Sequence, residues 1–235
     1  MNSMRAALFC VFFPCAILPA SPAVSAGGDG SMAGAFMPGA EDTISLPSVP
    51  PRGNVSIEEA IWLRRSVRKF SGEIPSAEAI SLLLWSAQGI TDAKFGLRSA
   101  PSAGATYPLE IYLATSEYLA RYIPGKHCLV VAMREDVRAG LAAAALGQEW
   151  VAGAPLVFVF TAAIARTALR YDERANLYVP IEVGCASENL MLEAAALGLG
   201  SVAVGAFREK DVGKALKLPK GLDPYLIVPV GVPAK

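Results

Sequence analysis

The segment from about Val179 to Leu197 is the feature of this sequence that most constrains its fold. As a helix it is apolar on most of its circumference, with Glu182, Asn189 and Glu193 along one stripe. Such a helix has to be buried on several sides, at the centre of a domain or at a contact between two subunits. The chain has 235 residues, of which 53% are hydrophobic, and this length predicts a single domain with one sizeable core.

Helical and strand patterns alternate along the rest of the chain. Ser56 and Glu59 form a capping box that starts one helix, and Ser76 starts a second helix that ends at Gly89. A further helix is expected at about 135–146, and strands are expected at about 109–115, 128–133, 156–162, 201–204 and 226–230. Helices that alternate with short strands predict an α+β layered domain.

The clearest binding signal is the run RRSVRKF, which follows the first expected helix. It places Arg64, Arg65, Ser66, Arg68 and Lys69 close together in a chain with 21 basic and 21 acidic residues, so no overall field favours nucleic acid or membrane. Guanidinium groups bind phosphate oxygens in a planar, two-pronged manner and a hydroxyl adds a donor, so the cluster fits a phosphate monoester. The alternative is a solvated basic helix end, where cations offset the helix dipole.

Two other segments combine glycine with small side chains. One is the loop Pro101, Ser102, Ala103 and Gly104, and the other is the strand end Ala203, Val204, Gly205 and Ala206. Small residues let the backbone approach a ligand closely. The alternatives are an ordinary turn before a strand for the first segment and a helix–strand packing joint for the second. The glycine spacing in LGLGSVAVG does not match a dinucleotide-binding fingerprint.

Together these segments resemble the nitroreductase superfamily of FMN enzymes, and within it the SagB-type dehydrogenases that oxidise azoline rings in modified peptides. The similarity runs through SIEEAIWLRRSVRKF, LLLWSAQGIT, PSAGATYPLEIY, GQEWVAGAP and YLIVPVGVP, and covers nearly all of the chain beyond residue 43. The resemblance implies an α+β, nitroreductase-like fold with a central, mostly antiparallel sheet flanked by helices. It also implies FMN as cofactor and a homodimer.

The resemblance further implies a role for each of the three segments. Arg64, Ser66 and Arg68, with Arg65 beside them, match the positions that hold the phosphate and ribityl chain of FMN in nitroreductases. The loop 101–104 matches the one that reaches the flavin from the other subunit. The segment 203–206 matches strand backbone that lies against one face of the flavin ring.

On the long helix the chain departs from the SagB-type pattern. Cys185 and Glu188 stand where that group commonly has histidine and glutamine, and Leu177 precedes Tyr178 where arginine is common. These departures speak against peptide azoline oxidation and leave flavin binding untouched. Candidates for substrate contact, each with a structural role as the alternative, are Tyr107, Arg170, Tyr171 and Arg174.

Histidine and cysteine content excludes other chemistries. His127 is the single histidine, so a histidine-rich zinc site is excluded and no metal is expected. Its place at the start of an expected strand predicts a structural role rather than membership of a Ser-His-Asp triad. Cys128 and Cys185 either pair in an oxidising compartment or serve as small apolar fillers.

The N-terminus has the composition of an export signal. Arg5 precedes an apolar run that ends at Leu18, and Val24, Ser25 and Ala26 provide the small residues that signal peptidase requires. The sequence predicts a signal peptide at 1–26, a Gly/Pro-rich leader or arm at 27–53 and a nitroreductase-like FMN-binding domain at 54–235. The expected location is periplasmic or secreted, with no stable membrane insertion after cleavage. An uncleaved N-terminal anchor is the alternative.

The sequence therefore predicts an exported FMN-dependent oxidoreductase that transfers hydride between flavin and a small molecule or modified peptide. The alternative is a catalytically silent flavin-binding or scaffold protein of the same fold. The sequence does not indicate which residues are catalytic. Export, together with the lack of a Rossmann motif, argues against NAD(P)H as the electron donor.

Overall fold

The computed structural model describes residues 42–50 and 53–235. The predicted signal peptide, residues 1–26, lies outside the described residues, as do residues 27–41, 51 and 52 of the predicted arm. The described part of the arm contains a short strand, β1 (Thr43–Ser45), which pairs with a strand of the central sheet.

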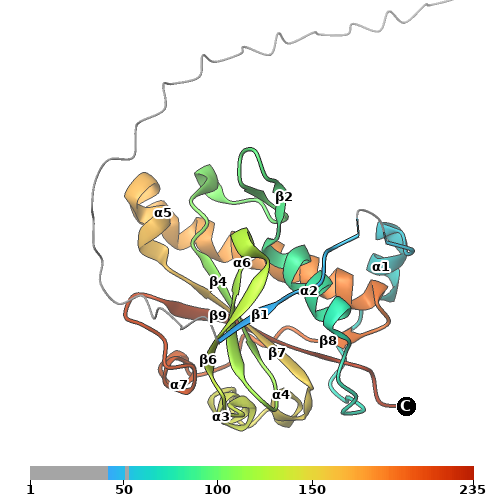
Figure 1. The fold of residues 1–235 in the computed structure, drawn as a ribbon. Coiled ribbons are helices and arrows are strands. Elements are labelled where there is room, and N and C mark those ends of the chain that lie inside the picture. The colour runs from blue at the N-terminus through green and yellow to red at the C-terminus, as the bar shows by residue number, and fades with distance from the viewer. Residues whose placement is uncertain (1–41, 51–52) are drawn as a thin grey trace, which may run out of the picture. The chain divides into compact units, whose positions relative to one another are not determined.

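The centre of the fold is a seven-stranded sheet in which all paired strands are antiparallel (Figure 1). Besides β1 it contains β4 (Leu109–Ala114), β5 (Leu119–Ile123), β6 (Cys128–Met133), β7 (Leu156–Ala162), β8 (Gly200–Ser201) and β9 (Asp223–Gly231). The strand order is β1-β6-β5-β4-β7-β9-β8. A separate hairpin is formed by β2 (Ile90–Asp92) and β3 (Leu97–Arg98). The predicted α+β fold with a central antiparallel sheet is confirmed.

Helices cover both faces of this sheet. They are α1 (Ile57–Leu63), α2 (Ala77–Gln88), α3 (Arg138–Ala144), α4 (Glu149–Gly153), α5 (Ile164–Tyr171), α6 (Ala175–Ala196) and α7 (Glu209–Ala215). The predicted caps are confirmed: the side chain of Ser56 accepts a hydrogen bond from the backbone of Glu59, and that of Ser76 accepts one from Ala79, each at 3.2 Å. These caps satisfy amide groups that the first helical turn leaves unpaired.

Alternation of side chains along the strands creates a hydrophobic core on each face of the sheet. In β4, Ile111 and Leu113 belong to the core beneath α2 and α6, whereas Tyr112 and Ala114 belong to the core beneath α3, α4 and α7. This is the two-residue period of a strand that is covered on both faces. All seven residues of β7 are buried, which places this strand at the middle of both cores.

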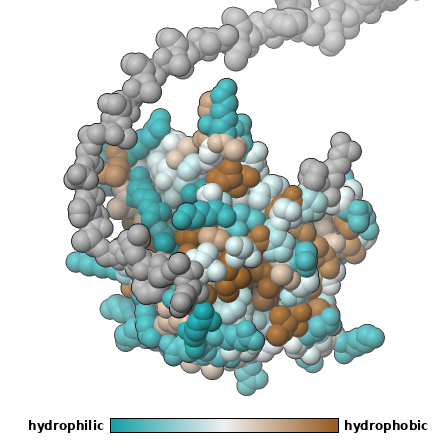
Figure 2. Space-filling view, in the orientation of Figure 1, coloured by the Kyte–Doolittle hydropathy of each residue, from teal (hydrophilic) through white to brown (hydrophobic). Residues whose placement is uncertain are grey.

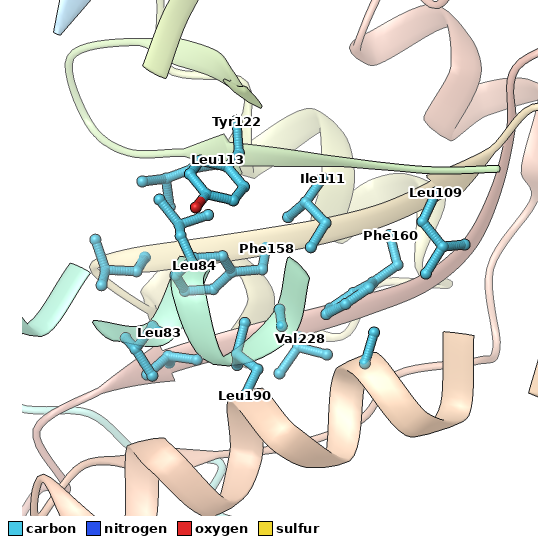
Figure 3. Close-up of a cluster of buried hydrophobic side chains, with 14 of the residues drawn as sticks. Leu83, Leu84, Leu109, Ile111, Leu113, Tyr122, Phe158, Phe160, Leu190 and Val228 are labelled. Atoms are coloured by element: carbon cyan, nitrogen blue, oxygen red, sulfur yellow. The ribbon is translucent and has the colours of Figure 1, made fainter. Parts of the chain in front are cut away.

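Helix α6 packs over the first core, as its apolar sequence predicts. Figure 3 shows Leu190 of α6 and Leu84 of α2 near the phenylalanine rings of β7, and all four side chains are fully buried. The opposite side of α6 is open, because Leu177 and Ile181 are each 54% exposed. Burial on one side therefore explains only part of the apolar character of this helix.

Several element boundaries differ from those predicted. Helix α6 begins at Ala175 rather than Val179 and continues through Pro180, because the tertiary packing of α6 outweighs the backbone hydrogen bond that proline removes. Helix α3 is shorter than predicted, since Asp136 accepts hydrogen bonds from Arg138 in a turn before it. The predicted strand 201–204 shrinks to β8 and a single bridge at Val204. No pattern in the sequence predicted β1, β2, β3, β5, α4, α5 or α7.

His127 has the structural role that its position predicts. Its ring nitrogens lie 2.7 Å from Oγ of Ser81, 2.9 Å from the hydroxyl of Tyr122 and 3.0 Å from the carbonyl oxygen of Pro47. The side chain thus fastens the segment after β1 to α2 and β5. Cys128 and Cys185 are both free, so they do not pair within the chain.

Candidate functional site

The predicted phosphate-binding segment lies directly beside β8. Arg64 caps the C-terminal end of α1, and the chain then continues in an extended conformation. The amide of Val67 donates to the carbonyl oxygen of Ser201 at 2.9 Å, and Ser66 forms a parallel bridge with Ser201. The structure therefore brings the basic segment 64–68 next to the segment that leads into 203–206.

Gly200 makes this close approach possible. A Cβ atom at this position would lie 2.6 Å from Cβ of Val67, far inside van der Waals contact. The backbone of β8 therefore approaches the basic segment more closely than any residue with a side chain permits. Gly200, the second glycine of the LGLG run, is thus required by the packing of this fold.

The three arginines of the basic segment have different surroundings. Nε of Arg64 lies 3.4 Å from a carboxylate oxygen of Glu188 on α6. Arg65 turns back and donates to the carbonyl oxygens of Trp62 at 2.8 Å and of Arg64 at 2.7 Å, so it caps α1. The guanidinium of Arg68 stacks over the ring of Trp150 on α4, 5.6 Å from its centroid.

A cavity of about 310 Å³ opens at this end of α1. Arg64, Arg65 and Ser201 line it, together with the Gly198–Leu199 turn after α6. The side chains of Arg64, Arg65 and Ser201 thus meet at one concave surface whose other lining residues are mainly apolar.

The segment 203–206 presents its backbone to solvent. Val204 is buried and exchanges hydrogen bonds with Ile227 of β9 at 2.8 and 3.1 Å. Ala203, Gly205 and Ala206 are exposed, and the carbonyl oxygen of Ala206 accepts a hydrogen bond from Gln148 at 3.0 Å. Val204 therefore anchors the segment, and the exposed small residues on either side of it stay accessible to a flat ligand.

The loop 101–107 has an unusual backbone. Gly104, Ala105 and Tyr107 have φ angles of 59°, 54° and 45°, and the last two are not glycines. Left-handed backbone of this kind persists only where surrounding contacts impose it. A hydrogen bond of 2.9 Å from the amide of Tyr107 to Oγ of Ser102 closes the loop on itself.

Helix α5 holds this loop from outside. Arg170 donates to the carbonyl oxygen of Gly104 at 3.2 Å, and the hydroxyls of Thr106 and Thr167 lie 2.9 Å apart. A side chain at position 104 would meet the hydroxyl of Tyr171 at 2.6 Å, so glycine is required there for space as well as for backbone angle. In the described residues no hydrogen bond joins this loop to the segments 64–68 or 203–206.

An arginine–tyrosine pair forms beside this loop although the sequence lacks the adjacent pair. Nε of Arg174 donates to the hydroxyl of Tyr178 at 2.8 Å, one helical turn away. The rings of Tyr171 and Tyr178 meet edge to face with centroids 5.1 Å apart. Tyr178 thus has an arginine partner from the preceding turn.

A buried carboxyl group lies beneath the loop. Glu182 of α6 is 3% exposed. Burial raises the pKa of this carboxyl group, and Ser102, Arg98 and Gln88, which face it, oppose that rise. The sequence places Glu182 and Glu188 on the long helix but predicts neither the burial of Glu182 nor the pairing of Glu188 with Arg64, and it gives no sign that Trp150 stacks on Arg68. Their roles depend on contacts between distant parts of the chain.

The described residues lack two kinds of feature. They contain no cluster of three or more histidine, cysteine, aspartate or glutamate side chains suited to a metal ion. Within the same part of the chain, no helix is sufficiently long and apolar to cross a membrane.

Exposed apolar side chains lie on α1 and, separately, at the start of α6. Trp62 is 76% exposed and Ile61 is 58% exposed, while Leu177 and Ile181 project from α6. Figure 2 shows hydrophobic areas between hydrophilic ones on the side of the molecule that it presents. Apolar surface of this kind is typical of a contact with another protein surface.

The chain is similar to known nitroreductases in sequence and in fold. A protein of Methanocaldococcus jannaschii that carries the name nitroreductase is 38% identical over 196 residues, which span 81% of this chain and 97% of that protein. A crystal structure of a nitroreductase from Ralstonia eutropha superposes with a TM-score of 0.77 at 29% identity, covering 83% of this chain and 90% of that one.

A more distant likeness shows the same fold. The NADPH:FMN oxidoreductase of Vibrio harveyi, solved with NAD+, has a TM-score of 0.57 and 22% identity over 76% of this chain and 69% of that one. The profile of the nitroreductase family matches residues 62–232. The nitroreductase-like fold expected from the three segments is confirmed, and the chain belongs to the nitroreductase family.

Proposed function

We propose that this protein is an FMN-dependent oxidoreductase and that Arg64, Ser66 and Arg68 hold the cofactor phosphate. The observation that carries the proposal is the placement of this basic segment against β8, where Val67 is hydrogen-bonded to Ser201. That contact brings the basic segment next to the strand that leads into the segment 203–206. The FMN oxidoreductase of Vibrio harveyi has the same fold, which supports the choice of cofactor.

The residues present fit a phosphate-bearing flavin. Arg64 and Arg68 each offer a guanidinium at the surface, and Ser66 is exposed beside them. Bound FMN would accept and release hydride at its ring, and the protein would supply position and electrostatic environment. The exposed backbone of 203–206 would lie against the ring, and Val204 would keep that backbone in place. Arg65 would act indirectly, by capping the helix that presents Arg64.

The proposal includes a homodimer. The loop 101–104 belongs to the flavin site by resemblance, and within one chain no hydrogen bond of the described residues joins it to the basic segment. A second copy would bring its own loop to the flavin. Exposed Trp62, Leu177 and Ile181 would supply the apolar contact that such an interface requires.

The proposed substrate is a small molecule or a modified peptide, and the proposed location is outside the cytoplasm. Loss of the histidine and glutamine common in SagB-type enzymes favours a substrate other than a peptide azoline. An exported enzyme works away from the NAD(P)H pool, so a reduced small molecule, a modified peptide or a membrane-linked redox partner would supply the electrons. A catalytically silent flavin-binding or scaffold protein is the second candidate, favoured by those same two losses.

Purified protein tests these proposals in two steps. Full-length protein expressed with its N-terminus should carry FMN, identified by its visible spectrum and by mass after release. Anaerobic mixing with candidate reductants, including NADH and NADPH, followed by nitroaromatic or quinone acceptors, should then bleach and restore the flavin absorbance. Colourless protein that fails to bind added FMN refutes flavin dependence. Bound flavin that no reductant bleaches supports the silent candidate, and rapid bleaching by NADH at about 1 per second or more refutes the proposed donor class.

A further inference from the structure

The GQEW run, residues 147–150, belongs to the sequence that resembles nitroreductases, and it lies outside the three segments assigned to the flavin. It joins α3 to α4: Gln148 precedes the first turn of α4, and Trp150 lies within that turn. Both side chains are partly buried, and each contacts a different segment of the proposed flavin site.

The backbone that leads into this run turns sharply. Leu146 and Gly147 have φ angles of 60° and 78°, in the left-handed region that a leucine rarely adopts. The amide of Gly147 donates to the carbonyl oxygen of Ala142 at 2.9 Å, and that of Gln148 donates to the carbonyl oxygen of Ala145 at 3.3 Å. These bonds impose the turn, and a strained backbone that is held in this way is often found beside functional sites.

The side chain of Gln148 fastens the segment 203–206 to the end of α3. Its Nε2 atom donates to the carbonyl oxygen of Ala145 at 2.9 Å and to that of Ala206 at 3.0 Å. Both partners only accept hydrogen bonds, so an amide with two N–H groups satisfies both of them. The backbone amide of Arg208 adds a bond of 2.9 Å to the last residue of α3. The backbone expected to lie against the flavin ring is therefore held at its C-terminal end.

The ring of Trp150 contacts the guanidinium of Arg68 without using its hydrogen-bond donors. The guanidinium carbon lies 5.6 Å from the ring centroid, which is a cation–π distance. In the part of the chain that the structure describes, this guanidinium has no hydrogen bond and no ion pair. Its N–H groups therefore stay available for a phosphate, whereas the guanidinium of Arg64 already binds Glu188.

One hydrophobic core supports both contacts of the GQEW run. Ala145 at the end of α3, Val151 in α4 and Val204 are buried together in the core beneath α3, α4 and α7. Trp150 packs against the same core. Since the interior of a protein is densely packed, side chains that are anchored in it hold their positions closely. Both contacts thus come from a well-packed part of the fold.

We propose that the GQEW run positions two parts of the flavin site: Trp150 orients Arg68 toward the FMN phosphate, and Gln148 fixes the backbone of 203–206 against the ring. This inference rests on the proposed function, in which those two segments bind FMN. Gln148 and Trp150 are positioning residues, because each acts on the flavin through another residue. The two residues should therefore affect different parts of the cofactor.

Riboflavin, which lacks the phosphate of FMN, separates the two roles. Trp150→Leu removes the ring beside Arg68 and should raise the Kd for FMN about three- to fivefold, and the Kd for riboflavin less than about twofold. Gln148→Ala frees the backbone of 203–206 and should raise the Kd for both flavins about three- to tenfold. Trp150→Phe keeps an aromatic face and should bind FMN within about twofold of wild type. Fluorescence titration of flavin-free protein measures these constants.

A double-mutant cycle with FMN alone tests the same separation. In the Arg68→Ala background, Trp150→Leu should weaken FMN binding by less than about twofold, because the side chain through which it acts is gone. Gln148→Ala should keep its effect of about three- to tenfold in that background, since it acts on the ring. Independent, additive losses for Trp150→Leu and Arg68→Ala would overturn the role of Trp150.

Trp85→Leu is the matched control. Trp85 is also a partly buried indole, but its N–H donates to the carbonyl oxygen of Ile90 at 3.2 Å, and no arginine of the described residues lies over its ring. Its replacement should lower the melting temperature without changing the ratio of the two flavin Kd values. If Trp150→Leu does not fold, Trp150→Met takes its place, since the flexible methionine fills more of the vacated space without an aromatic ring.

The outcomes separate this inference from the proposed function. A wild-type protein that binds neither flavin refutes the proposed function and the inference with it. Wild-type protein that binds FMN, together with Trp150→Leu and Gln148→Ala variants that bind it equally well, refutes the inference alone. A Trp150→Leu variant that loses affinity for FMN and riboflavin to the same extent overturns the assignment of Trp150 to the phosphate.

Discussion

Arg64 and Glu188 form an ion pair that links the end of α1 to α6, with Nε of the arginine 3.4 Å from Oε1 of the glutamate. Their side chains are 35% and 48% exposed, so the pair contributes little to stability. The pair matters for ligand binding, because a phosphate group at Arg64 would compete with the Glu188 carboxylate for the same guanidinium. By the resemblance to SagB-type proteins, this glutamate stands at a position where that group commonly has an uncharged glutamine.

Removal of this competing carboxylate should tighten FMN binding. We expect Glu188→Gln to lower the Kd for FMN by about two- to fivefold, the scale of an exposed ion pair. Fluorescence titration of flavin-free protein measures this change. Glu173→Gln, which removes an exposed carboxylate that forms no ion pair in the described residues, should leave the Kd unchanged. Weaker binding by Glu188→Gln would show that the carboxylate supports the site.

The arginines of the basic segment should differ in their effect on FMN. Replacement of Arg64 or Arg68 by alanine should weaken binding by about 1.5 to 3 kcal/mol, the range of charge-assisted hydrogen bonds. Arg65→Ala should mainly lower the melting temperature, because Arg65 caps α1 through the carbonyl oxygens of Trp62 and Arg64. Titration and thermal melting of the three variants separate the two effects. If the Arg64 and Arg68 variants both purify with full flavin, the phosphate is held elsewhere.

Gly200→Ala should separate β8 from the basic segment. The added Cβ would lie 2.6 Å from Cβ of Val67, and this overpacking should cost about 1–3 kcal/mol of stability and reduce FMN affinity as well. Chemical denaturation and flavin titration report the two losses. Gly213→Ala in α7 is the control, since nothing lies within 4 Å of the added atom and alanine favours a helix. A Gly200→Ala protein with wild-type stability would show that the contact relaxes easily.

Glu110 should make the protein sensitive to acid. Its carboxylate binds Arg121 at 2.8 Å and also Arg166. Burial by itself raises the pKa of Glu110, but the two arginines outweigh it and the pKa lies below the usual 4.5. The ionised form is therefore the stabilising one, and its contribution is present above pH 4.5 and is lost as the pH falls through the lowered pKa.

Glu110→Gln should remove that sensitivity. The variant should be about 1–3 kcal/mol less stable near neutral pH, and the difference from wild type should shrink as the pH falls below the usual carboxyl range. Urea denaturation across the acid range measures it. Glu135→Gln breaks the exposed pair with Lys217 and should change stability by less than about 1 kcal/mol at any pH. A constant difference between wild type and Glu110→Gln would contradict the assignment.

A homodimer should depend on the apolar side chains of α1 and α6. Trp62→Glu combined with Ile181→Glu places two charges on surface that is now apolar, and it should yield monomers with reduced flavin content. Sedimentation at micromolar concentration shows the state of assembly. Leu146→Glu alters an equally exposed apolar residue next to α3 and should leave the dimer intact. A wild-type protein that sediments only as flavin-loaded monomer would refute the dimer.

The sequence by itself determined the features that depend on local pattern. Ser56 and Ser76 cap helices because a hydroxyl three residues before an amide can reach it, and the two-residue alternation in β4 follows from strand geometry. The run RRSVRKF also indicates an anion site by composition alone. These signals were sufficient for the fold class and for the choice of the three segments.

Only the tertiary structure decided what each site residue contacts. Glu188 lies 124 positions beyond Arg64 in the chain, and Trp150 lies 82 positions beyond Arg68. Arg64 and Arg65 are adjacent in the same basic run, yet Arg65 caps α1 whereas Arg64 pairs with Glu188. Arg98 of β3 bonds to Gln88 at the end of α2, and Pro180 stays within α6 because packing outweighs its local preference. Pairings between residues so far apart depend on the complete sheet and its helices, so no local pattern in the sequence specifies them.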